Sequence, residues 1–72
     1  MQDKYYVSSN GDILRIKDMD SVYLVNAYAK KHRELYNCKT KKEFSEVKET
    51  MNNLQEEIET RLNGFYEGLN DE

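Results

Sequence analysis

A periodic row of apolar side chains in the second half of the chain limits its fold more than any other feature. From Phe44 to Leu69 the apolar residues follow one another at intervals of 3, 4, 3, 4, 4, 3 and 4 positions. This spacing places them on one face of an amphipathic helix, which must bury that face against another element. We expect the helix to cover residues 40–66, beginning at Thr40 with a capping box in which Glu43 bonds back to the cap.

The chain is too short to form a large hydrophobic core around this helix within one copy. Domains below roughly 70–80 residues rarely gain more than about 3–5 kcal/mol from a single core, and of these 72 residues only 38% are hydrophobic. Cys38 and His32 are the one cysteine and the one histidine, so neither a disulfide framework nor a four-ligand zinc site is available. We therefore expect one domain, residues 1–72, that forms a homo-oligomer, with no metal or cofactor. The expected interface is Phe44, Val47, Met51, Leu54, Ile58 and Leu62.

A shorter helix is expected over residues 21–37. Asp18, Asp20 and Ser21 are cap candidates for its start, where the helix dipole favours acidic groups. The break at residues 37–39 is short, which favours an antiparallel helical hairpin. Its apolar stripe is expected to contain Leu24, Val25, Tyr28 and Leu35, with Tyr36 as a further candidate and Val22 and Ala29 on the flank.

The first 17 residues predict a β-hairpin over residues 4–17. Asn10-Gly11 is the strongest short hairpin signal, because a two-residue type I′ turn needs positive φ at both central positions. Counting outward places Val7 opposite Leu14 and Tyr6 opposite Arg15, which can then lie on the Tyr6 ring. The face expected to pack is Tyr5, Val7, Leu14 and Ile16. The expected fold class is α+β: an N-terminal hairpin and an antiparallel pair of helices, the second long and amphipathic.

Charge is unevenly distributed along the chain. Residues 1–42 carry a net charge of +4, from nine Lys and Arg against five Asp and Glu, whereas residues 43–72 carry −7, from two against nine. Six cations gather around the turn between the helices and form a basic corner that is a candidate site for a phosphate or an acidic protein surface. The alternative is solvated charge that complements the end of a helix. The basic corner is Lys30, Lys31, Arg33, Lys39, Lys41 and Lys42. Tyr6 and Arg15 of the hairpin are further candidates for binding.

The sequence gives little support for a catalytic function or for a membrane function. His32 and Cys38 are six positions apart, which is not a metal-ligand spacing on one helix face, and no third orienting residue accompanies them. We expect no catalytic residues and no enzymatic activity. No stretch approaches the ~18 apolar residues of a membrane span, and MQDKYYVSS lacks the apolar core of a signal peptide. The expected location is cytoplasmic, without a membrane partner.

The segment YVSSNGDILRIKDMDSVYLVNAY, about a third of the chain, resembles a module of small phage-encoded proteins, most of which have no assigned function. Tyr23 stands where those proteins commonly carry histidine. The resemblance implies a phage or prophage setting, with the host cytoplasm as the location, and no particular activity. The matching residues are Tyr6, Gly11, Leu14, Ile16, Asp18, Met19, Leu24, Asn26 and Ala27.

These observations lead to one functional expectation and two alternatives. The expectation is a small phage-type binding protein that oligomerises and inhibits or sequesters a host protein, with a component of antiviral defence as one candidate. One alternative is a nucleic-acid-binding accessory that uses the basic corner, although the acidic second half opposes it. The other is a sponge for a small anionic nucleotide, bound by Lys and Arg with stacking on Tyr.

Overall fold

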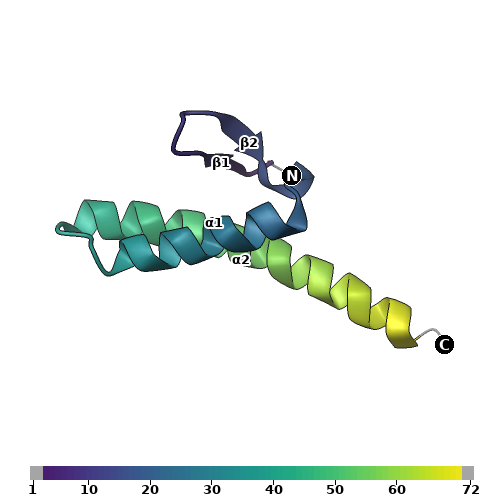
Figure 1. The fold of residues 1–72 in the computed structure, drawn as a ribbon. Coiled ribbons are helices and arrows are strands. Elements are labelled where there is room, and N and C mark those ends of the chain that lie inside the picture. Colours follow the sequence, from purple (N-terminus) through teal and green to yellow (C-terminus); the bar gives the residue numbers. More distant parts are fainter. Residues whose placement is uncertain (1–2, 71–72) are drawn as a thin grey trace.

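The computed structural model describes residues 3–70 and confirms the expected α+β class. A hairpin of two short antiparallel strands lies over one side of an antiparallel helical hairpin (Figure 1). A single 3-10 turn joins the two parts in the described chain. The elements in chain order are β1 (Tyr5–Val7), β2 (Ile13–Arg15), η1 (Ile16–Asp18), α1 (Ser21–Leu35) and α2 (Lys41–Asn70).

The strand register differs by one residue from the expected one. Tyr6 lies opposite Leu14 and Val7 opposite Ile13, because the loop has three residues, numbers 9–11, instead of two. Ser8 N–H donates to Asp12 O across the base of this loop, and only Gly11 has a positive φ, of 87°. This arrangement is the three-residue hairpin loop with a left-handed residue in its last position.

The change in register exchanges the two faces of β1. A shift of one residue turns every side chain of a strand to the other side, so Tyr6 is buried against the helices while Tyr5 and Val7 face solvent. Leu14 and Ile16 pack inward as expected. The expected burial of Tyr5 and Val7 was therefore wrong, and Tyr6 takes their place.

Helix α1 begins where the cap residues predict and ends two residues early. Asp20 is the cap, and its Oδ2 accepts a hydrogen bond of 3.1 Å from Val22 N–H. The buried face of α1 is narrower than expected, since Leu24 and Ala27 are buried whereas Val22 and Val25 are exposed. The helix therefore carries two apolar stripes. The hairpin and α2 cover the stripe that contains Leu24, and the stripe that contains Val22 and Val25 is exposed.

Helix α2 shows the predicted capping geometry with one difference. Thr40 Oγ1 accepts from Glu43 N–H at 3.1 Å, while the Glu43 carboxylate accepts from the backbone of Lys39, one residue before the cap. The helix continues to Asn70 instead of ending at residue 66, through Gly64, whose cost in a helix is only about 1 kcal/mol.

The apolar row of α2 meets α1 only along part of its length. Leu54 is completely buried in the core and Met51 is also buried. The core cluster contains Tyr6, Ile16, Met19, Leu24, Ala27 and Leu54, with Leu14, Tyr28 and Ile58 packed against it. Because α2 has 30 residues and α1 has 15, the carboxyl end of α2 extends beyond the body of the molecule (Figure 1).

Two residues of α2, Arg61 and Glu56, make polar contacts with distant parts of the chain. Arg61 donates from Nε to Glu57 at 2.9 Å, from one terminal nitrogen to Ser21 Oγ at 2.9 Å, and from the other to Lys17 O at 3.3 Å. Lys4 forms an ion pair of 2.6 Å with Glu56. Arg61, which occupies the position where a strict heptad from Phe44 would place an apolar residue, therefore links the start of α1 to α2.

Candidate functional site

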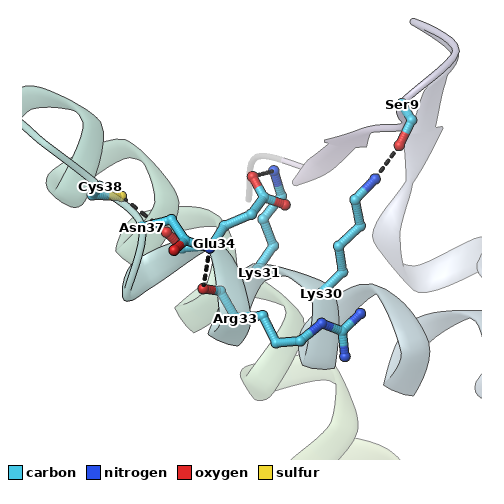
Figure 2. Close-up of polar contacts among 7 residues, drawn as sticks. All are labelled: Ser9, Lys30, Lys31, Arg33, Glu34, Asn37 and Cys38. Carbon is cyan, nitrogen blue, oxygen red and sulfur yellow. Dashed lines mark hydrogen bonds and ion pairs between the residues drawn. The ribbon is translucent and has the colours of Figure 1, made fainter.

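The cations of the basic corner do not share one surface. Figure 2 shows Lys30 and Lys31 reaching from α1 toward the hairpin, whereas Arg33 runs along another side of the helix. Lys30 Nζ donates to Ser9 Oγ in the hairpin loop, and Lys31 pairs with Glu34 at 3.4 Å. The cations of α1 are thus divided between the hairpin side and an outer side of the molecule.

The other three cations of the corner lie around the start of α2. Lys39 precedes the helix and uses its backbone N–H to bond the Glu43 carboxylate. Lys41 and Lys42 are exposed in the first helical turn. The dipole of α2 disfavours positive charge at that end, and Glu43 supplies the acidic group that the first turn favours.

A shallow pocket forms where the hairpin loop approaches α1. Its volume is about 260 Å³, and it combines two aromatic rings with polar groups at the rim. Its lining residues are Tyr6, Ser9, Tyr23, Asn26, Ala27 and Lys30. The two tyrosine rings meet edge to face, with centroids 6.3 Å apart. This pocket places a lysine beside two tyrosine rings, the combination that the small-anion alternative requires.

Lys30 differs from the other half-buried cations of the described residues in its partner. Lys31 and Arg61 each pair with a carboxylate, whereas Lys30 bonds the Ser9 hydroxyl. Its charge is therefore not neutralised by a neighbouring acid within ion-pair distance in the described part of the chain.

Tyr6 belongs to the core and not to an exposed binding surface. Lys31 Nζ lies 5.7 Å from the centre of its ring, in the place expected for Arg15. Burial raises the pKa of the Tyr6 hydroxyl above its usual value, and the charges of Tyr23 and Glu34 raise it further. Arg15 instead pairs with Asp3 and Asp18, at 3.7 and 3.6 Å, because the actual register places it opposite Tyr5.

The outer face of the hairpin exposes a cluster of large apolar side chains. Tyr5, Val7 and Ile13 are 51%, 57% and 70% exposed, and the pairing of Val7 with Ile13 makes them neighbours across the strands. We name these three residues the outer hairpin face. The sequence contained the apolar residues, but the expected register hid Tyr5 and Val7 in the core.

Most of the residues expected at an interface between two copies pack against other parts of the same chain. Met51 and Leu54 are buried, and Val47 and Ile58 are half-buried. Phe44 and Leu62, at the two ends of the row, are 42% and 48% exposed. The middle of the α2 row is therefore not available to a second copy, and an oligomer would need a different surface.

His32 and Cys38 are placed in different surroundings. The His32 ring lies between those of Tyr28 and Tyr36, with centroids 6.4 and 5.4 Å away. The Cys38 thiol donates to Glu34 O at 3.3 Å, and desolvation together with Glu43 and Glu34 raises its pKa. A nucleophilic cysteine needs a lowered pKa, so this environment acts in the opposite direction.

Sequence reasoning named Tyr6 and Lys30 as binding candidates but missed the contacts of Arg61 with Ser21 and Lys17. It also missed the other four pocket residues, which are Ser9, Tyr23, Asn26 and Ala27. Tyr23, Ala27 and Lys30 are spaced to share one side of a helix, and that signal was present although nothing identified the side as the one beneath the hairpin. The contact of Lys30 with Ser9 spans 21 positions and that of Arg61 with Ser21 spans 40. Contacts this distant in sequence leave no local pattern.

Comparison with known proteins finds no match to this chain among family models, curated proteins or solved structures. Within the described residues, no helix is both long enough and apolar enough to span a membrane. The same residues contain no group of three or more His, Cys, Asp or Glu side chains suited to hold a metal ion.

Proposed function

We propose that this protein is a non-enzymatic binding protein that inhibits or sequesters a host protein by docking on it with the outer hairpin face. The observation that supports this proposal is the exposure of Tyr5, Val7 and Ile13 on one side of a two-stranded hairpin. Full burial of an apolar side chain of this size is worth about 1.5–3 kcal/mol. Three such side chains in one cluster are a candidate centre for a protein interface.

The shape of this surface favours a protein over a small ligand. Small molecules bind in concave sites that enclose most of their surface, whereas the outer hairpin face belongs to a two-stranded sheet that lies over the helices (Figure 1). Each strand of a two-stranded sheet also has one unpaired edge, to which an extended segment of a partner can add.

The distribution of cations gives less support to nucleic acid. A nucleic-acid surface gathers Lys and Arg on one face along the phosphate backbone. Here Lys30 and Lys31 point toward the hairpin and Arg33 along another side (Figure 2). The resemblance to phage proteins favours a host protein as the partner.

Affinity capture with paired variants tests this proposal. The wild-type chain, Ile13→Lys and Asn52→Lys are immobilised in parallel and exposed to bacterial host lysate. Ile13→Lys places a charge in the outer hairpin face, and Asn52→Lys adds the same charge at an exposed position of α2. We expect a host protein to be retained by the wild type and Asn52→Lys but lost with Ile13→Lys.

The captured protein is then purified and its affinity for each variant is measured. A loss of more than about tenfold in affinity for Ile13→Lys alone supports docking through the hairpin. Equal retention by Ile13→Lys and the wild type would contradict it, as would the absence of any saturable partner.

A further inference from the structure

Helix α1 carries a second apolar stripe on the side that neither α2 nor the hairpin covers. Val22, Val25 and Tyr36 are 69%, 52% and 79% exposed, and Tyr36 continues the helical backbone as the residue after α1. The stripe runs at intervals of 3, 4, 3 and 4 positions, the spacing of a helix that packs against another helix. We name it the outer α1 stripe, and it consists of Val22, Val25, Ala29, His32 and Tyr36.

We propose that the outer α1 stripe is the interface between two copies of this chain, which pair antiparallel about a two-fold axis through Ala29. Ala29 is at the centre of the stripe: Val22 and Tyr36 are each seven positions from it, and Val25 and His32 are four and three positions from it. An antiparallel pair therefore places each Val22 against Tyr36 of the second copy, and each Val25 against His32. The small side chain of Ala29 lies where the two helices approach most closely.

The shape of the stripe is complementary to itself. A shallow groove of about 330 Å³ lies at the start of α1, lined by Ser21, Val22, Val25 and Asn26. At the other end of the stripe is Tyr36, the most exposed of the large hydrophobic side chains that the structure describes. In the antiparallel pair the Tyr36 ring of one copy enters this groove on the other, and the two-fold axis repeats the contact.

Charge also favours the antiparallel arrangement. The chain enters α1 through Asp18 and Asp20 and leaves it through Arg33 and Lys39. Antiparallel pairing places the acidic entry of one copy beside the basic exit of the other and opposes the two helix dipoles. Parallel pairing would instead bring like charges together. This arrangement brings the acidic groups of a second copy toward Lys39, whose backbone N–H already bonds the Glu43 carboxylate.

The surface area of the chain is consistent with a missing partner. Its accessible surface is 5849 Å², whereas a compact monomer of this mass exposes about 4,700 Å² by the usual scaling. The molecule is elongated, with extents of 49 × 24 × 23 Å. The outer α1 stripe and the outer hairpin face lie on separate elements, so pairing of two copies leaves the proposed docking surface to another partner.

Sedimentation of three chains tests the interface. Val25→Lys and Val7→Lys make the same substitution at positions of similar exposure, one in the outer α1 stripe and one in the outer hairpin face. We expect a concentration-dependent dimer for the wild type and Val7→Lys. Val25→Lys should weaken the dimer by more than about tenfold, because the substitution enters a two-fold interface twice. Circular dichroism checks that each variant remains folded.

Cysteine cross-linking tests the antiparallel register. In a Cys38→Ser background, Ala29→Cys places a thiol on the two-fold axis, where it faces its own copy and oxidises to a disulfide-linked dimer. Val22→Cys faces Tyr36 of the second copy and should remain unlinked. A wild-type monomer at every concentration overturns the proposal. So does a dimer that Val7→Lys disrupts and Val25→Lys does not, and cross-linking of Val22→Cys would show a parallel pair.

Discussion

For the replacement of Arg61 by methionine, the sequence pattern and the structure predict opposite changes in stability. Position 61 is where a strict heptad from Phe44 would place an apolar residue, so the pattern alone predicts that Arg61→Met stabilises α2. In the structure the guanidinium joins three groups: the Glu57 carboxylate, the Ser21 hydroxyl and the Lys17 carbonyl. The structure therefore predicts that Arg61→Met destabilises the fold.

The size of the loss follows from the three contacts. An i,i+4 ion pair on a helix contributes about 0.3–0.5 kcal/mol. A net hydrogen bond contributes about 0.5–1.5 kcal/mol, and the bond to the Lys17 carbonyl, at 3.3 Å, belongs at the lower end. The free energy of unfolding should fall by about 1–2.5 kcal/mol, which lowers the melting temperature by roughly 5–20 °C in a domain of this size.

Urea and thermal unfolding followed by circular dichroism measure this effect. Arg33→Met is the control, because it removes a guanidinium from the exposed side of α1. The stability of Arg61→Lys should lie between those of the wild type and Arg61→Met. An ammonium keeps the pairing charge but cannot bond several acceptors at once with the planar geometry of a guanidinium. Amide exchange should accelerate at Met19 and Val22, where the chain enters α1. An Arg61→Met variant as stable as the wild type would refute this account of Arg61.

Two further predictions concern the core. Leu54→Ala should lower the free energy of unfolding by about 2–5 kcal/mol, because Leu54 is completely buried. Leu62→Ala, on the exposed part of the row, should lower it by less than about 1 kcal/mol. Equal losses of the two variants in urea unfolding would contradict the packing of α2. The raised pKa of Tyr6 predicts that stability declines above about pH 10, because the unfolded chain releases this proton at the usual tyrosine pKa while the folded chain retains it. Tyr6→Phe should show a smaller decline between pH 9 and 11 in thermal unfolding, and identical pH profiles would show that burial of Tyr6 has no such effect.

Local sequence patterns determined the elements of this fold. The spacing of apolar residues predicted α2, and Asp20 and Thr40 marked the starts of the helices because a cap needs only neighbouring backbone groups. Asn10-Gly11 predicted the hairpin. Each of these signals acts over a few residues, so it can be interpreted without knowing the rest of the structure.

Only the tertiary structure decided which faces the elements bury. Helix α1 has two apolar stripes, and packing on α2 and the hairpin selects the one with Leu24 and leaves Val25 exposed. The loop of three residues sets the strand register and so buries Tyr6 instead of Tyr5.

Packing also decides which candidate binding surfaces are exposed. The basic corner exists in the sequence, but the side chains of Lys30 and Arg33 separate because each follows its own side of the helix (Figure 2). Long-range contacts such as Arg61 with Ser21 require both helices to be in place before either residue meets its partner. For this reason the sequence determined what the chain is built from, and packing determined which of its surfaces remain open to a partner.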